Sequence, residues 1–298
     1  MAILQDYQFE LGGVAFGYGL PVAVDGEGFD PGTDDPETQD SFTGFSESLD
    51  FGVDSLQPAS WAWAAHTDKA INDLEAVEAS RQLEIAWRTA CDRRDPGAVA
   101  ALRYAMAGRT RVVFGRPRRY SSTKTNSMIY GLIDITSEFQ RADTLFYGDD
   151  VKAITLRMQP QESRGFVSPI VSPITTLIGA TSLSSTSMIG GDEPAPFIAT
   201  INGPSSGSIT NPRISNGQWE LQLLVSIAAG ESVEISTYPW AMRATRNDGA
   251  SVSGRFTAKS RLSKARLAVA GETLRLDGID SSGTATATVQ WRTAYSTI

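Results

Sequence analysis

Residues 219–237 read WELQLLVSIAAGESVEIST, and this stretch decides the fold class of the chain. Its first half alternates apolar and mostly polar residues, the period-two pattern of a half-buried β-strand. The apolar positions are Trp219, Leu221, Leu223, Val225 and Ile227. A turn over 228–231 follows, and the alternation resumes over 233–237. The stretch therefore predicts two antiparallel strands joined by a turn.

The same pattern recurs toward the end of the chain, where every second residue from 285 to 291 is apolar. Pairs that favour tight turns separate the strands, because their second residue tolerates a positive φ. These pairs are Asn202-Gly203, Asn216-Gly217, Asp248-Gly249 and Asp277-Gly278. Short strands with frequent turns predict an antiparallel β-sandwich over 197–298, with Trp219, Val289 and Trp291 in its core.

Composition limits the class of protein further. The chain has 298 residues, enough for two domains, and its 41% hydrophobic and 20% charged residues are ordinary for a globular protein. We see no apolar run near the ~18 residues that cross a bilayer, and no signal peptide. Cys91 is the single cysteine, which excludes an internal disulfide and fits folding in a reducing cytoplasm. One His and one Cys predict no zinc-type metal cluster, and no cofactor is expected.

Charge is distributed in two blocks of opposite sign. Residues 1–68 contain 13 Asp or Glu and no Lys or Arg, whereas residues 69–124 contain 12 Lys or Arg and 6 Asp or Glu. The first block therefore carries −13 and the second +6. Such blocks can attract each other within a subunit or between neighbours, or they can be two solvated faces.

The first block predicts short strands and one exposed loop. Alternation or apolar runs indicate strands over 3–11, 14–16, 22–24 and 60–65. Asp25 to Asp40 is rich in Asp, Gly and Pro and should form an exposed loop, without the acid spacing of a calcium loop. Trp61 and Trp63 share one face of their strand, which favours core packing over the alternative of stacking on a sugar.

The second block predicts two helices and an arginine-rich strand. Apolar spacing indicates a helix over 71–87. A second helix is expected to begin at Asp95-Pro96, with Asp as the N-cap and Pro at the first helical position, and to end at Gly108. A strand over 111–115 precedes Arg116, Arg118 and Arg119. These arginines could hold a phosphate backbone, but a chain with net charge −8 and pI near 4.8 favours a salt-bridge patch between subunits.

Further strands are expected over 128–135, 139–140 and 151–158, the first pairing with the last and Asp149-Asp150 at the hairpin tip. Residues 159–196 are rich in Pro, Ser, Thr and Gly and are the best candidate for a domain boundary. Within them, Ile174, Leu177 and Ile178 suggest a segment that docks as a strand or arm.

Two ordered sets of motifs resemble a known family. The C-terminal order IATINGP, ITNPRISNG, the 219–237 stretch, LRLDG and ATATVQWRTAY is similar to the C-terminal domain of distal tail proteins of long-tailed bacteriophages. Residues 87–120, WRTACDRRDPGAVAALRYAMAGRTRVVFGRPRRY, resemble minor tail proteins from phages of actinobacteria. The resemblance covers nearly the whole chain, and its motifs are structural rather than catalytic.

The resemblance implies a mainly β protein with two domains. Residues 1–160 would form an N-terminal split β-barrel or sandwich that builds a ring, with one or two helices in an insert near 69–108. Residues 161–196 would be a linker or docking arm, and 197–298 a galectin-like antiparallel β-sandwich. The family forms rings, usually of six copies, at the tail tip of the virion after synthesis in the host cytoplasm.

The function that the resemblance implies is structural, not enzymatic. The ring would join the tail tube to the tip and let DNA pass without specific binding. Partners would be further copies, the tail tube, tape measure and hub proteins, and receptor-binding proteins or fibres. His66, the one histidine, has no nucleophile motif beside it, so no serine triad is expected.

Three sets of residues are candidate sites. Arg116, Arg118 and Arg119 are candidates for a subunit interface. Asp34, Asp35 and Glu37 are candidates for an acidic wall of the channel, since like charge keeps DNA from sticking; an exterior loop or contact with a neighbour's arginines are the alternatives. Trp240, beside Pro239, is the one candidate for sugar stacking if the chain is instead a carbohydrate-binding protein of the tail tip.

Overall fold

A computed structural model describes residues 3–38, 40–42, 49–50, 55–67, 72–123, 130–158, 185–280 and 282–298. The chain divides into two compact units: unit 1 is Met1–Asp149 with Tyr295–Ile298, and unit 2 is Asp150–Ala294. The division falls inside one strand and near the end of another, whereas the sequence suggested 159–196. Of that segment 159–184, including Ile174, Leu177 and Ile178, lies outside the described residues.

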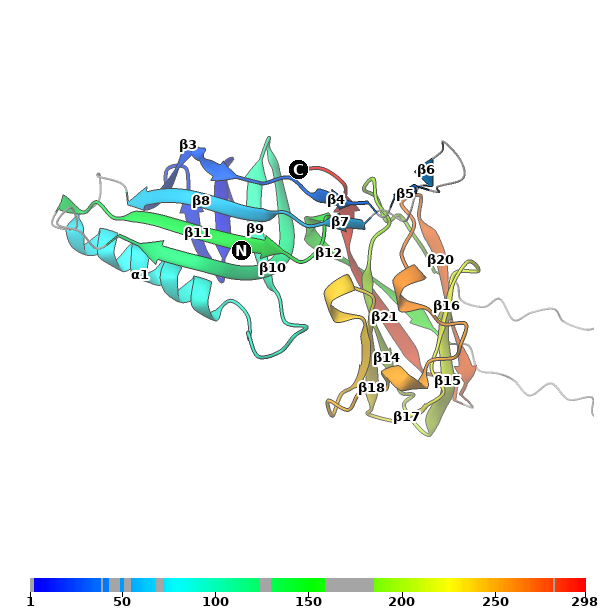
Figure 1. Ribbon diagram of the computed structural model, residues 1–298. Coiled ribbons are helices and arrows are strands. Elements are labelled where there is room, and N and C mark those ends of the chain that lie inside the picture. The colour runs from blue at the N-terminus through cyan, green and yellow to red at the C-terminus, as the bar shows by residue number, and fades with distance from the viewer. Residues whose placement is uncertain are drawn as a thin grey trace, which may run out of the picture. The chain divides into compact units, whose positions relative to one another are not determined.

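Unit 1 is a β-structure with one long helix (Figure 1). Its elements are β1 (Gln8–Leu11), β2 (Val14–Gly17), β3 (Val22–Asp30), β4 (Asp35–Glu37), β5 (Ser41–Phe42), β6 (Leu49–Asp50), β7 (Ser55–Gln57), β8 (Ser60–Thr67), α1 (Asp73–Thr89), β9 (Ala100–Met106), β10 (Arg109–Ser122), β11 (Asp134–Arg141) and the start of β12 (Phe146–Arg157).

The strands of unit 1 pair antiparallel in the order β12-β10-β11-β8-β3. β9 pairs with both β10 and β1, and β2 pairs with β1. Two small ribbons, β4–β7 and β5–β6, follow β3 along the chain and precede β8. The pairing of β3 with β8 is thus the base of a long hairpin that carries both ribbons.

An aromatic core fills unit 1 and settles the role of the first tryptophan pair. Trp61 and Trp63 are 0% and 2% exposed. The Trp63 ring lies 5.4 Å from Phe9 and 5.6 Å from Trp87 of α1, both in edge-to-face geometry. Core packing is confirmed, and sugar stacking by these two rings is excluded by their burial.

Helix α1 is confirmed, but its buried face differs from the expected one. The residues that contact the core are Ala76, Ser80, Leu83, Ala86 and Trp87. Leu74, Val77 and Ile85, expected inside, are 78%, 37% and 45% exposed. Asn72 caps the helix by accepting a hydrogen bond from the Glu75 N–H. The buried face thus combines three small residues with the large side chains of Leu83 and Trp87.

The expected second helix is wrong, because residues 100–106 form strand β9. β9 pairs with β1 and β10 along its two edges, and its consecutive residues Leu102 to Ala105 are all buried, so both of its faces are covered there. A strand buried on both sides lacks clean alternation and can imitate helical spacing. Gly108 does not end a helix; with Ala107 it forms the β9–β10 turn, at φ of 70° and 50°.

Three further expectations in unit 1 are corrected. Asp25 to Asp40 is not one loop, because β3 continues to Asp30 and β4 begins at Asp35. β11 and β12 do not pair with each other but lie on either side of β10. Asp149-Asp150 is therefore inside β12 rather than at a hairpin tip. Residues 128 and 129 of the expected strand 128–135 lie outside the described residues.

Unit 2 holds the remaining strands in two sheets (Figure 1). Its elements are β13 (Ser185–Ser187), β14 (Phe197–Asn202), β15 (Ser208–Ser215), β16 (Glu220–Gln222), β17 (Ser226–Ala228), β18 (Ser232–Ser236), η2 (Pro239–Ala241), β19 (Arg243–Arg246), η3 (Ser253–Arg255), η4 (Leu262–Lys264), β20 (Glu272–Ile279) and β21 (Thr286–Tyr295). One sheet has the order β19-β18-β14-β21-β12; the other has β13-β20-β15-β16, with β17 on β15.

The core of unit 2 follows the alternation read from the sequence. Val289 and Trp291 of β21 are 0% and 2% exposed. Trp219 is half-buried: its ring stacks on Phe197 at 5.3 Å, and its Nε1 donates to the Arg266 carbonyl at 3.0 Å. The strand expected over 219–227 is divided into β16 and β17. The predicted mainly β class with antiparallel sheets is confirmed.

Two of the four turn pairs are turns and two are not. Gly217 and Gly249 have φ of 92° and 84°, as expected. Gly203 and Gly278 are glycines for another reason, close approach of neighbouring atoms. A Cβ on Gly203 would lie 1.9 Å from the Ala228 carbonyl oxygen, and one on Gly278 would lie 2.9 Å from the Ile209 side chain.

Candidate functional site

The first candidate arginine, Arg116, is held by its own chain. Its Nε donates to the Ala98 carbonyl at 2.9 Å, and its Nη2 donates to the carbonyls of Asp95 and Pro96 at 2.5 and 2.8 Å. These acceptors lie in the connection between α1 and β9. Arg116 therefore fixes this loop against β10, a structural role that the sequence did not indicate.

Arg118 and Arg119 are displayed by a bulge in β10. Pro117 pairs with Phe139 and Tyr120 with Ser137, so two arginines oppose the single residue 138 of β11. Both side chains are exposed, and neither has a hydrogen-bond or ion-pair partner among the described residues. The bulge thus points two neighbouring guanidinium groups to solvent where a regular strand would alternate them.

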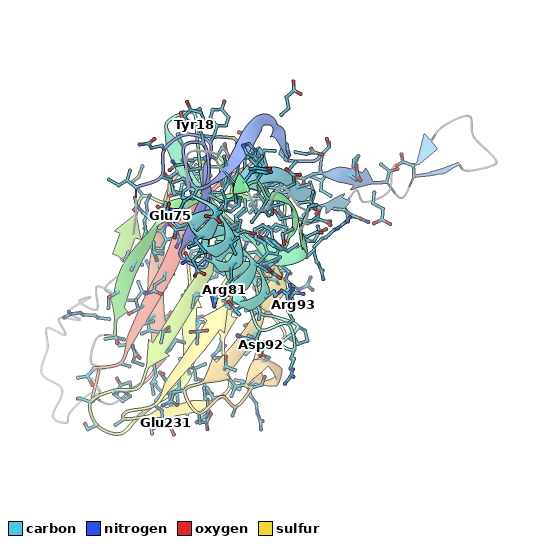
Figure 2. All side chains as sticks on the ribbon, turned by 90° about the vertical axis from the view of Figure 1, so that its left-hand side faces the viewer. Tyr18, Glu75, Arg81, Asp92, Arg93 and Glu231 are labelled. Carbon is cyan, nitrogen blue, oxygen red and sulfur yellow. The ribbon has the colours of Figure 1, made fainter. Side chains whose placement is uncertain are left out.

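Two more arginines adjoin this bulge. The Arg93 Nη2 donates to the Pro117 carbonyl at 3.2 Å, and exposed Arg94 follows it in the chain. Asp92, labelled beside Arg93 in Figure 2, accepts the Arg94 backbone N–H at 2.9 Å. We call Arg93, Arg94, Arg118 and Arg119 the arginine patch.

The acidic candidates separate into an anchor and an exposed pair. Asp34 Oδ1 accepts from the Ala59 N–H at 2.7 Å and from Arg141 Nη1 at 3.1 Å. The Arg141 side chain is 3% exposed and lies over the Phe146 ring at 4.3 Å. Burial lowers the pKa of Arg141, and the charge of Asp34 opposes that shift. Asp34 therefore anchors the chain before β4 to the body of unit 1.

Asp35 and Glu37 lie on the ribbon β4–β7, whose six residues are all exposed. The register pairs Asp35 with Gln57, Pro36 with Leu56 and Glu37 with Ser55. Because side chains of paired residues share a face, Asp35, Glu37, Ser55 and Gln57 form a polar face, and Pro36 and Leu56 an apolar one. Gln57 Nε2 donates to Glu37 Oε2 at 3.2 Å on the polar face. We call β4–β7 the acidic ribbon.

A buried ion cluster in unit 1 was missed by the sequence reading. The Arg103 Nε and Nη2 donate to the two carboxylate oxygens of Asp149 at 2.8 and 2.6 Å, and its Nη1 donates to Glu10 at 2.6 Å. The hydrogen bonding of the Arg103 guanidinium to the Asp149 carboxylate contributes most to raising the pKa of Arg103. The cluster joins β1, β9 and β12. It was missed because residue 103 was assigned to a helix and Asp149 to a turn.

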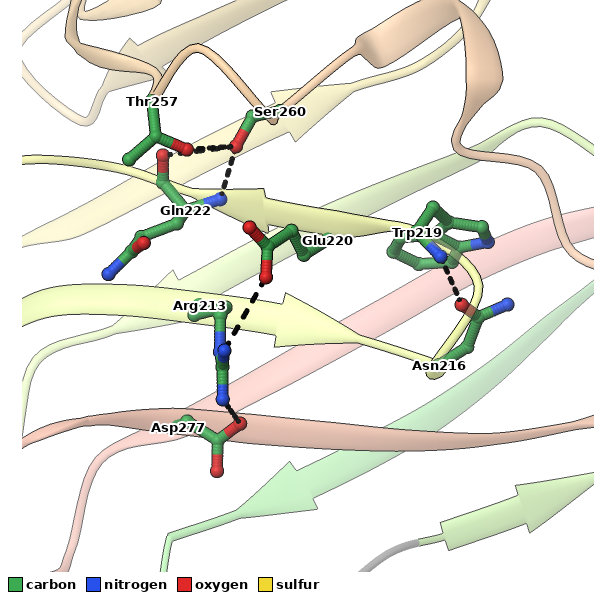
Figure 3. Close-up of polar contacts among 8 residues, drawn as sticks. All are labelled: Arg213, Asn216, Trp219, Glu220, Gln222, Thr257, Ser260 and Asp277. Atoms are coloured by element: carbon green, nitrogen blue, oxygen red, sulfur yellow. Dashed lines mark hydrogen bonds and ion pairs between the residues drawn. The ribbon is translucent and has the colours of Figure 1, made fainter.

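Trp240 lies in the short helix η2 of unit 2 and is partly exposed. Its ring centroid is 5.0 Å from that of Tyr238, at an interplanar angle of 37°. On the second sheet of unit 2, Arg213 binds Asp277 at 2.9 Å and Glu220 at 3.4 Å (Figure 3). This face carries paired charges, and the Trp219 ring beside it packs on Phe197 instead of forming a platform there.

Within the described part of the chain, no group of three or more His, Cys, Asp or Glu could hold a metal ion. His66 lies in β8, in register with Ala23 and Asp134 of the adjacent strands, and neither of these is a serine. Among the described helices none is long and apolar enough to cross a bilayer.

No protein-family model matches the chain, and no curated protein matches it in sequence. Its fold is similar to the crystal structure of SPP1 Dit, described as a paradigm of the hub adsorption apparatus in phages infecting Gram-positive bacteria. The TM-score is 0.57 at 10% identity, and the match covers 96% of this chain and 98% of that one.

Two structures of the phage P2 baseplate in its activated conformation, with Ca and with Sr, also match. Their TM-scores are 0.49 and 0.48 at 8% identity, over 91% of each chain. These two matches are too weak to carry an argument.

Proposed function

We propose that this chain is a structural protein of a phage tail tip, where several copies form a ring that joins the tail tube to the tip. The supporting observation is the fold match to SPP1 Dit, which extends over both units and nearly the full length of both chains. At 10% identity the likeness is one of fold, so the role is our inference from it. We also propose that the phage infects actinobacteria, as the resemblance of residues 87–120 implies.

Unit 1 has what ring formation requires. A closed ring needs a head-to-tail contact in which each copy presents two different surfaces. Unit 1 presents the exposed arginine patch and the exposed acidic ribbon, which carry opposite charge. We propose that unit 1 forms the ring, usually of six copies, and that the bore passes DNA without specific binding.

Unit 2 is then free for other contacts. We propose that its galectin-like sandwich carries receptor-binding proteins or fibres, while the ring contacts the tail tube, tape measure and hub proteins. Asp35 and Glu37 are exposed and remain candidates for a channel wall; Asp34 is less suited, because it is paired with Arg141. No step of this role uses catalysis or a cofactor.

Electron microscopy of the purified full-length protein tests this proposal. The expected particle is a closed ring whose mass is an integral multiple of 32.0 kDa and whose centre is open. Mass photometry over a range of protein concentrations supplies an independent measure of copy number. A protein that stays monomeric at high concentration and low salt, and yields no rings, would contradict the proposed function.

A second candidate function is carbohydrate binding by unit 2. The observation in its favour is the partly exposed Trp240 ring packed beside Tyr238, since aromatic rings stack on sugars. A glycan-array screen of the full chain, repeated with Trp240→Ala, discriminates the two functions. Binding that Trp240→Ala abolishes would favour the carbohydrate role; rings with no glycan bound would favour the structural one.

A further inference from the structure

The acidic ribbon lacks a covering surface. All six of its residues are exposed, including Leu56 at 58%. A two-stranded ribbon alone is marginally stable in water, because it buries little apolar area. This one has a polar face and an apolar face, and the residues of both faces are exposed. Docking of its polar face on a cationic surface would pair the carboxylates of Asp35 and Glu37.

Two members of the arginine patch, Arg118 and Arg119, also lack partners among the described residues. They are adjacent and both exposed, and neither forms an ion pair with a described residue. The bulge that displays them interrupts the β10–β11 pairing between Pro117 and Tyr120. Bulges re-aim side chains at sites where pairing is sacrificed, so this one presents positive charge outward. Exposed adjacent cations repel each other, which an anionic partner would relieve.

The two surfaces are complementary in charge and spacing. Asp35 and Glu37 are two residues apart on one face of a strand, about 7 Å along it, and two adjacent arginine side chains easily span that distance. Arginine binds carboxylates through paired N–H groups, which adds geometric specificity. The first 68 residues contain no Lys or Arg, so no basic side chain of this segment can neutralise the acids of the ribbon.

No ion pair joins the ribbon to the patch among the described residues of one copy, so a contact between them would come from a second copy. Asp34 fixes the base of the ribbon to Ala59 and Arg141. In Figure 2 the ribbon extends away from the part of unit 1 that carries Arg93. Surfaces at different places on one unit produce a head-to-tail contact between copies, the kind that closes a ring.

We propose that the acidic ribbon of one copy binds the arginine patch of the next copy, with Asp35 and Glu37 facing Arg118 and Arg119. This inference rests on the proposed function, because it specifies the contact that holds the ring together.

Charge exchange in the full-length chain tests the proposal. Arg118→Glu with Arg119→Glu should weaken self-association by about tenfold or more, and so should Asp35→Lys with Glu37→Lys, because each change replaces two attractions by repulsions. The combination of all four changes should restore association. The measurement is analytical ultracentrifugation at low and at physiological salt, where screening should weaken the wild-type contact.

Matched controls separate this contact from general charge effects. Arg109→Glu changes an exposed arginine at the other end of β10, and Glu234→Lys changes an exposed acid of β18; neither should alter association. Circular dichroism melting checks that each variant folds.

The outcomes distinguish the inference from the proposed function. Suppose that the wild type forms rings. Unchanged association in both double variants, or no recovery in the combined variant, would then overturn the proposed contact but not the proposed ring. A wild-type protein that never associates would overturn the ring itself. Rings that persist in Asp35→Asn with Glu37→Gln, together with slower DNA ejection from virions, would place the acids on the channel wall and also overturn the contact.

Discussion

Replacing Arg103 by Met should destabilise unit 1 more than any surface charge change. Arg103 makes three hydrogen bonds to the carboxylates of Asp149 and Glu10, and its side chain is 9% exposed. The acids are 24% and 14% exposed. Met keeps much of the stem volume but leaves both carboxylates without their cation.

The magnitude follows from that desolvation. Removing one partner of a buried pair costs about 3–5 kcal/mol, because the remaining charge is left uncompensated. For a unit of this size, that loss corresponds to a fall in Tm of about 6–20 °C. The cluster also joins three strands, so amide hydrogen exchange should accelerate in β1 and β9.

Thermal unfolding by circular dichroism measures the effect, and hydrogen exchange assigns it to unit 1. A matched control is Arg81→Met, which removes the exposed pair with Glu78 at 3.3 Å and should cost under about 1 kcal/mol. Removing all three charges together, by Arg103→Met, Glu10→Gln and Asp149→Asn, should recover much of the loss. A triple variant no more stable than Arg103→Met, or a single variant as stable as the control, would refute the reasoning.

Three further changes test unit 2 and the chain terminus. Trp291→Ala should cost about 3–5 kcal/mol in chemical denaturation, since it empties a site that is 2% exposed; an unchanged midpoint would mean that the core of the sandwich is misassigned. Burial alone would raise the pKa of Asp280, but hydrogen bonds from Ala285 and residue 282 outweigh it and lower that pKa. Asp280 should therefore stabilise the fold above its unfolded pKa near 4 and lose this contribution as pH falls through its lower folded pKa, so Asp280→Asn should flatten the acid limb of a stability–pH curve. Tyr295→Leu should cost about 0.5–2 kcal/mol, because the Arg111 guanidinium lies 3.7 Å from the Tyr295 ring centroid; equal melting of the two proteins would show that this contact adds nothing.

Where apolar and polar residues alternate, the sequence alone determined the structure. The period-two pattern in β18 and β21 placed Val233, Ile235 and Trp291 in the core, and all three are buried. Alternation suffices there because one face of each strand is covered and the other is not, so side-chain direction follows position parity.

Prediction from the sequence pattern failed where both faces of a strand are buried, and where a glycine is needed because neighbouring atoms approach it closely. The sequence of β9 looked helical because Leu102 to Ala105 are all buried, so apolar residues do not alternate with polar ones along the strand. Gly203 and Gly278 looked like turn residues, although only the approach of Ala228 and Ile209 explains them. No local pattern carries that information, because the contacting atoms come from distant strands.

The candidate site divides in the same way. Composition alone identified the acidic and arginine-rich segments, since charge is counted without knowing the fold. Only the tertiary structure separated Arg116 and Asp34, which are paired within the chain, from Arg118, Arg119, Asp35 and Glu37, which are exposed. The physical reason is that a charged side chain is paired within the chain only if folding brings a hydrogen-bond partner within reach. Pairing between strands that are far apart in the sequence sets those distances.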